Sequence, residues 1–136
     1  MFLETSGELL RSGIGIRFRA GGQSMHPTIR DGELITVEPI AHDKIRRGDI
    51  VLYRFKRGVI AHRVVRIGKQ RDSLVFTLRG DAMPTSDAPV KAEAILGRVV
   101  CVERAGRLVK LAGKRARLAR SARALASRIK AKSSHQ

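Results

Sequence analysis

Short β-rich runs, separated by turn residues, recur through most of this chain, and no helical pattern comes between them. Apolar side chains alternate with polar ones at Ile14, Ile16 and Phe18, which is the period of a half-buried strand. The β-rich runs are residues 14–19, 33–40, 48–55, 59–67, 73–80 and 94–104. Their spacing predicts a mainly β, antiparallel core of about 90 residues.

Two connections within this core have distinct patterns. Lys56, Arg57 and Gly58 stand between two β-rich runs, and we expect a three-residue hairpin loop with glycine at its end. Residues 81–93 contain two prolines and several small polar side chains. This connection is long enough to be a functional loop.

The positive charge of the chain is concentrated near its C-terminus. The net charge is +16, but residues 1–103 contain 17 Lys/Arg and all 12 Asp/Glu, which leaves only +5. Residues 104–136 contain 11 Lys/Arg and no acid. A basic block of this kind attracts anionic surfaces, either lipid headgroups or nucleic acid.

An amphipathic pattern runs through the basic block. Leu118, Ala122, Leu125 and Ile129 form an apolar stripe at helical spacing, flanked by Arg and Lys. We therefore predict a basic amphipathic helix over residues 113–132. Such a helix can lie on an anionic membrane, dock on a partner protein or pack on the core. Nucleic acid is a weaker candidate, because the chain is only 4% aromatic and has no helix-turn-helix pattern.

These patterns divide the chain into three segments. Residues 1–13 form an N-terminal segment, with one or two helical turns expected over residues 4–11. Residues 14–104 form the β-rich core, and residues 105–136 form the basic helical tail.

Several classes of protein are excluded by the composition. The single cysteine, Cys101, rules out an internal disulfide framework and a zinc site with several thiolates, and we expect no metal or cofactor. The longest run without a charged residue is residues 20–29, which is too short and polar to span a bilayer. Glu4 and Glu8 argue against a secretion signal. We therefore expect a cytoplasmic protein or one peripheral to a membrane.

One bend carries a candidate nucleophile. In "GGQSMHPTIRDGE", residues 21–33, Ser24 follows a glycine pair and precedes a proline. A serine hydroxyl attacks well only with a base in hydrogen-bond reach and with donors for the developing oxyanion. A sharp bend can supply both, although a serine in a glycine-rich turn is more often a plain turn residue.

The chain offers few partners for such a serine. Of four histidines, His62 lies in a β-rich run beside aliphatic residues, an environment that keeps an imidazole neutral and able to act as a base. A lone histidine on an apolar face is more often a core residue. Asp81 and Asp87 are the candidates for the acid that orients the imidazole, or they are ordinary loop carboxylates.

Five motifs in order carry a family resemblance. They are "GGQSMHPTIRDGE", "RRGDIVLYR", "AHRVV", "LRGDAM" and "AILGRVV", spread from about Phe18 to Val102. Together they resemble the signal peptidase I family and the related LexA-type self-cleaving peptidases. The resemblance implies a partly open, barrel-like catalytic core and a serine endopeptidase without cofactors that acts on a peptide or protein substrate.

The resemblance also assigns roles to residues. It makes Ser24 the nucleophile and His62 the general base, as in the histidine variant of the family, where other members have a lysine. It favours Asp87 as the orienting acid, with Asp81 close behind. The oxyanion and substrate site would involve Gly22, Gln23 and Met25, with the Ser24 N–H as the chief donor.

Two departures from the family pattern leave other functions open. Signal peptidases usually hold a transmembrane helix just before the serine motif, and residues 1–19 cannot form one. Position 22 is glycine, where many signal peptidases have a serine that helps the oxyanion. The alternatives are a catalytically weak or idle peptide-binding module of the same fold, and a regulator that associates with nucleic acid or a membrane surface through the basic tail.

Overall fold

The strands of this chain form one antiparallel sheet, and along most of them more buried residues alternate with more exposed ones. The computed structural model describes residue 13 and residues 15–112. The strands are β1 (Ile16–Arg19), β2 (Leu34–Glu38), β3 (Ile50–Phe55), β4 (Gly58–Gln70), β5 (Ser73–Arg79), β6 (Val90–Lys91), β7 (Ile95–Arg104) and β8 (Arg107–Lys110). Two short 3-10 helices, η1 (His42–Lys44) and η2 (Ala92–Ala94), precede β3 and β7. The expected mainly β, antiparallel fold is confirmed.

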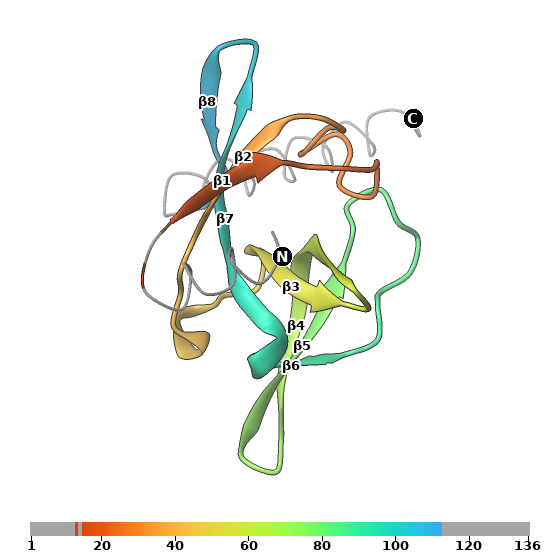
Figure 1. The fold of residues 1–136 in the computed structure, drawn as a ribbon. Coiled ribbons are helices and arrows are strands. Elements are labelled where there is room, and N and C mark those ends of the chain that lie inside the picture. Colours follow the sequence, from red (N-terminus) through yellow and green to blue (C-terminus); the bar gives the residue numbers. More distant parts are fainter. Residues whose placement is uncertain (1–12, 14, 113–136) are drawn as a thin grey trace, which may run out of the picture.

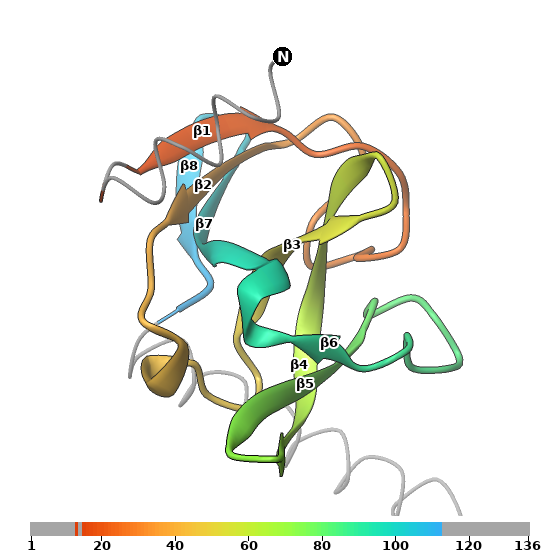
Figure 2. The same ribbon diagram turned by 60° about the horizontal axis from the view of Figure 1, so that its bottom comes forward.

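The order of the strands in the sheet is β1-β2-β7-β3-β4-β5-β6, with β8 paired to β7. The sheet is strongly curved but not closed, since β1 and β6 stand at the two ends of this order (Figure 2). The β7–β8 and β4–β5 hairpins project from opposite sides of the molecule (Figure 1). Because β7 lies between β2 and β3, it joins the N-terminal hairpin to the β3–β6 meander.

Strand β3 separates two hydrophobic clusters. Its residues Ile50–Tyr53 are all buried, because β3 has β7 on one side and β4 on the other. Ile50 and Leu52 point into a cluster with β2 and β7, whereas Val51 and Tyr53 point into a cluster with β4 and β5. The functional side chains described below lie where these two clusters meet.

A β-bulge resets the alternation in β7. Thr36 pairs with Cys101 and Val37 pairs with Val99, so Val100 has no partner of its own on β2. The extra residue turns β7 and keeps both Val99 and Val102 in the core, although they are three positions apart.

A buried aspartate fixes the start of β3 against β4. The Asp49 carboxylate accepts a 2.8 Å hydrogen bond from the Arg46 N–H, and the Asp49 carbonyl accepts a 2.7 Å bond from the Val64 N–H. Gly48 donates to the Val64 carbonyl at 2.8 Å. Val64 is two residues from His62, so this clamp also positions that histidine along β4.

The predicted three-residue hairpin loop was wrong, and the sheet extends past residue 104. The β3–β4 connection has two residues, Lys56 and Arg57, because Gly58 is already the first residue of β4 and pairs with Phe55 of β3. The segment 105–136 does not begin outside the sheet, since β8 pairs with β7 and Leu111 is buried in the core. The predicted helices over residues 4–11 and 113–132 lie outside the described residues.

Candidate active site

Ser24 lies in the bend between β1 and β2. Gly22 adopts a φ of +88°, a conformation that favours glycine, and its N–H donates to Asp31 Oδ1 at 2.9 Å. Met25 and Ile29, both buried, are joined by a 3.0 Å bond from the Ile29 N–H to the Met25 carbonyl. The bend is thus anchored to the core directly after a half-buried serine.

His62 stands on β4 and faces this serine. It is only 2% exposed and pairs with Val51 of β3. Ser24 Oγ lies 2.9 Å from His62 Nε2, a hydrogen-bond distance, although the two residues are 38 positions apart in the sequence. In this geometry, a neutral Nε2 can accept the hydroxyl proton.

Asp87 contacts the other nitrogen of the imidazole. It lies in the loop after β5, and its N–H donates to the Leu78 carbonyl at 2.7 Å. Its Oδ2 forms a hydrogen bond with His62 Nδ1. Because an ionised carboxylate only accepts, this contact places the proton on Nδ1 and leaves the Nε2 lone pair facing Ser24.

Tyr53 of β3 completes this chain of polar contacts, and it was not among the predicted site residues. Its hydroxyl donates to Asp87 Oδ2 at 2.8 Å and lies 3.4 Å from His62 Nδ1. Burial, together with the hydrogen bond to the Asp87 carboxylate, raises the pKa of Tyr53 well above its usual range. The phenol therefore stays protonated and remains a donor.

Asp81 belongs to a different cluster. It accepts two 2.7 Å hydrogen bonds from the Arg63 guanidinium and one of 2.6 Å from the Thr28 hydroxyl. Burial alone would raise the pKa of Asp81, but the Arg63 and Thr28 hydrogen bonds and nearby positive charge hold it below its usual value. The Asp81 carboxylate thus links the serine bend to β4 through its bonds to Thr28 and Arg63. The His62 ring bonds to Asp87 instead.

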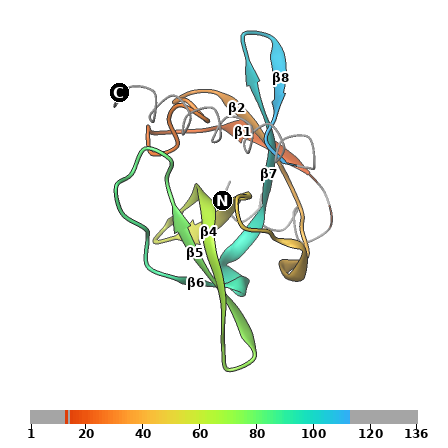
Figure 3. The ribbon, with the colours of Figure 1, turned by 180° about the vertical axis from the view of Figure 1, so that it is seen from behind.

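The loop after β5 is held against the serine bend. It rises along the side of the sheet toward the turn after β1 (Figures 1 and 3). The Ala82 N–H donates to the Ser24 carbonyl at 2.9 Å. A Cβ at Gly80 would lie 2.5 Å from that carbonyl oxygen and 3.0 Å from His62 Nε2. Only glycine lets the loop approach this closely.

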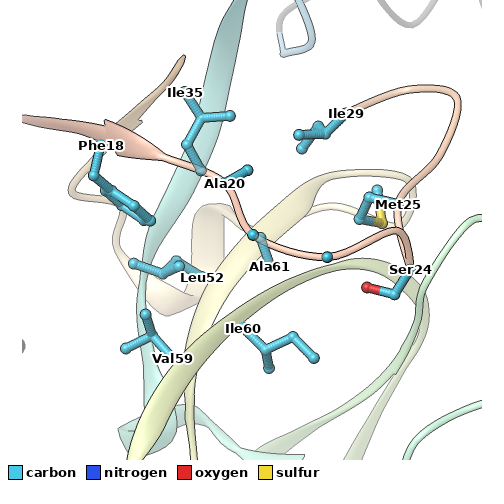
Figure 4. Close-up of a pocket in the computed structure, with 12 residues that line it drawn as sticks. Phe18, Ala20, Ser24, Met25, Ile29, Ile35, Leu52, Val59, Ile60 and Ala61 are labelled. Carbon is cyan, nitrogen blue, oxygen red and sulfur yellow. The ribbon is translucent and has the colours of Figure 1, made fainter. Parts of the chain in front are cut away.

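A small pocket, lined mostly by residues with apolar side chains, opens beside Ser24. Ser24 lies at one edge of the pocket, with side chains from β1 to β4 around the rest (Figure 4). The volume is about 80 Å³. A cavity of about 150 Å³ holds a benzene ring, so this pocket suits a smaller aliphatic side chain. The lining residues are Phe18, Ala20, Gly21, Gly22, Ser24, Met25, Ile29, Ile35, Leu52, Val59, Ile60 and Ala61.

The three residues predicted to bind oxyanion and substrate differ in position. Gly22 and Met25 line the pocket, but the Gly22 N–H is already bonded to Asp31, and Met25 Sδ accepts the Asp81 N–H at 3.3 Å. Gln23 is exposed to solvent. Within residues 15–112, no hydrogen bond occupies the Ser24 N–H, so it can serve an incoming oxygen.

The described residues hold neither a metal-site cluster nor a membrane-spanning helix. No group of three or more His, Cys, Asp or Glu side chains within them could hold a metal ion. No helix of the described part of the chain is long and apolar enough to cross a membrane.

Two comparisons with known proteins bear on these residues. A family model described as Peptidase S24-like matches residues 9–100. Signal peptidase I W of Bacillus subtilis (strain 168) is 36% identical over 75 residues, a match that covers 53% of this chain and 40% of that protein. The chain thus spans less than half the length of that relative.

Proposed function

Because this chain belongs to the Peptidase S24-like family, shared by signal peptidase I and LexA-type proteins, we propose that it is a serine endopeptidase. The family membership itself makes it a serine-peptidase-like protein. The observation that carries the proposal further is the contact of Ser24 Oγ with His62 Nε2 at 2.9 Å, with Asp87 on the opposite nitrogen of the same ring. The proposed nucleophile Ser24 is then hydrogen-bonded to the base His62, which in turn is hydrogen-bonded to the orienting acid Asp87.

In the first half of the proposed reaction, Ser24 is acylated. Its Oγ attacks the carbonyl carbon of a peptide bond, and His62 Nε2 takes the hydroxyl proton. The Asp87 carboxylate stabilises the imidazolium that forms. As the tetrahedral intermediate collapses, the C–N bond breaks and His62 gives the proton to the departing amine. The acyl group stays on Ser24 as an ester.

In the second half, water replaces the amine. His62 Nε2 takes a proton from the water, whose oxygen attacks the ester carbonyl. The C–Oγ bond then breaks, the proton returns to Ser24, and a carboxylic acid leaves. Each tetrahedral intermediate carries an oxyanion, for which the Ser24 N–H is the backbone donor we propose.

The pocket beside Ser24 supports a preference for small substrate side chains. Its volume of about 80 Å³ and its mostly aliphatic lining suit an alanine-sized or valine-sized group rather than an aromatic ring. We propose that an extended peptide segment lies along the bend and β4, with such a side chain in the pocket. The natural substrate would then be a peptide or protein with small residues before the cleaved bond.

Replacement of Ser24 tests the proposal without knowledge of the natural substrate. We expect a fluorophosphonate probe to label the wild-type protein on Ser24, which mass spectrometry of the digested protein will locate. Ser24→Ala should abolish this labelling. Ser73→Ala, which removes an exposed serine at the start of β5, is the matched control and should label as the wild type does.

A second arm separates an enzyme from a peptide-binding module of the same fold. A library of extended peptides should be cut by the wild-type protein, with small residues enriched before the cut, and should stay intact with Ser24→Ala. Labelling that persists in Ser24→Ala, or peptide binding without any cleavage, would overturn the proposal.

A further inference from the structure

We infer that Tyr53 is a positioning residue of the site, and that its hydroxyl fixes the Asp87 carboxylate against His62. The inference rests on the proposed function, because it concerns how the base of that reaction is held. It is carried by two contacts to one oxygen: both the Tyr53 hydroxyl and His62 Nδ1 bond to Asp87 Oδ2.

The need for such a residue follows from where Asp87 lies. Ser24 is held by the buried Met25 that follows it in the bend, and His62 is held by β4. Asp87 instead belongs to the loop between β5 and β6, where residues 82–86 are all exposed. Its side chain is 29% exposed, against 3% for His62. A carboxylate on such a loop can rotate toward water unless a fixed donor holds it.

Tyr53 has the properties of that donor. It lies on the central strand β3, is 0% exposed, and packs among the second hydrophobic cluster. A buried hydroxyl without a partner is costly, so the position of the ring forces its O–H toward an acceptor, and Asp87 Oδ2 is that acceptor at 2.8 Å. The raised pKa of Tyr53 keeps the proton on the phenol over the range in which proteins are stable.

The hairpin register aligns the two donors. Tyr53 pairs with Ile60, and Val51 pairs with His62. Residues two apart on a strand face the same side, so Tyr53 and His62 lie diagonally across one face of the β3–β4 pair. Their donor atoms therefore converge on one point outside the sheet, where a carboxylate oxygen fits. Held there, Asp87 keeps the proton on Nδ1 and the lone pair of Nε2 toward Ser24.

The test compares two hydroxyl deletions. Tyr53→Phe keeps the buried ring and removes the donor, whereas Thr36→Val removes a hydroxyl from β2, away from the site. The readouts are the two constants for labelling by a fluorophosphonate, the maximal rate and the half-saturating concentration. We expect Tyr53→Phe to lower the maximal rate about 10-fold, the scale of one hydrogen bond to a charged group. The half-saturating concentration should not change, and Thr36→Val should match the wild type.

Other outcomes have separate meanings. A Tyr53→Phe protein that folds and labels like the wild type overturns the inference and leaves the proposed function intact, as does a loss confined to the half-saturating concentration. Labelling that survives Ser24→Ala removes the proposed function itself.

A spectroscopic measurement keeps the inference testable if Tyr53→Phe does not fold. The chain has one tyrosine and no tryptophan, so the tyrosine absorption band reports Tyr53 alone. Asp87→Asn replaces a charged acceptor by a neutral one, and we expect the band to shift to shorter wavelength. An unchanged band in folded Asp87→Asn would show that the hydroxyl does not bond to this carboxylate and would overturn the inference.

Discussion

At the scale of single residues, the two aspartates after β5 are six positions apart but have separate surroundings. Asp87 bonds to an imidazole and a phenol, and Asp81 bonds to a guanidinium and a threonine hydroxyl. The first set of partners is suited to orient a base, and the second to hold the serine bend on β4. Substitution of each should therefore affect a different property.

We expect Asp87→Asn to lower the rate of Ser24 labelling by about 10³- to 10⁴-fold, because an amide neither stabilises an imidazolium nor fixes its tautomer. Asp81→Asn should lower the free energy of unfolding by about 2 kcal/mol, since it leaves Arg63 without a charged partner. Labelling of folded Asp81→Asn should fall by no more than about 10-fold. Labelling rates and urea titrations of both variants check this, and a greater rate loss in Asp81→Asn would contradict it.

The sequence predicted the partners of this site only in part. Ser24, His62 and Asp87 could be named from motif order, but Asp81 and Asp87 have the same local turn chemistry, so long-range contacts had to separate them. Tyr53 was missed, although a signal existed. A two-residue turn at Lys56 and Arg57 places Tyr53 on the face of His62, whereas the expected three-residue loop does not.

At the scale of strands, the close approach of β7 to β2 depends on a glycine. A Cβ on Gly97 would lie 2.7 Å from the Glu38 carbonyl oxygen and 2.8 Å from Val37 Cγ1. Val37 is also where the β2–β7 register shifts. The bulge and the glycine together let β7 bend around the end of β2.

Gly97→Ala should therefore destabilise the protein by about 2 to 3 kcal/mol, because the added methyl group meets backbone that cannot move without breaking strand pairing. Gly68→Ala is the matched control. Gly68 also lies in a strand, a Cβ there meets nothing within 4 Å, and alanine is the better residue in a strand by roughly 0.5–1 kcal/mol. Denaturant unfolding of both variants measures the difference; equal stabilities would count against the described register.

Alternation was enough to predict most of the strands, including the four-residue β1, but it failed for β6 and β8. β6 has two residues, too few for any period, and it forms because β5 offers it an edge. The residues of β8 are all exposed, so their burial pattern resembles that of a charged tail. Each of these segments is a strand only because it pairs with a partner, β5 for β6 and β7 for β8, and such pairing cannot be read from the local pattern.

At the scale of the whole molecule, the serine bend is tied to the far end of β7 by one ion pair. Arg104 donates two 2.7 Å hydrogen bonds to Glu33 and one of 3.0 Å to the Thr28 carbonyl. The Arg104 hydrogen bonds, aided by the Arg30 N–H, lower the pKa of Glu33 from 4.5 to about 2 despite its burial.

A group with a lowered folded-state pKa stabilises the protein above its unfolded value and loses that contribution as the pH falls through the folded value. We expect the Glu33 contribution to be complete above about pH 5 and lost progressively down to about pH 2. Glu33→Gln should therefore be less stable than the wild type by on the order of 2 to 3 kcal/mol at neutral pH, with the gap closing in acid. Urea titrations from pH 7 to pH 2 measure it, and a gap that widens in acid would refute the pairing.

The position of β7 between β2 and β3 has a consequence for how the protein comes into being. Every side chain of the proposed reaction lies before residue 90, but the strand that joins the two halves of the sheet comes after all of them. A ribosome releases residues 95–104 last among these elements. Under the proposed function, the growing polypeptide therefore contains all three side chains of the reaction before it contains the strand that joins the two halves of the sheet, and we expect their alignment to be complete only after residues 95–104 have been synthesised.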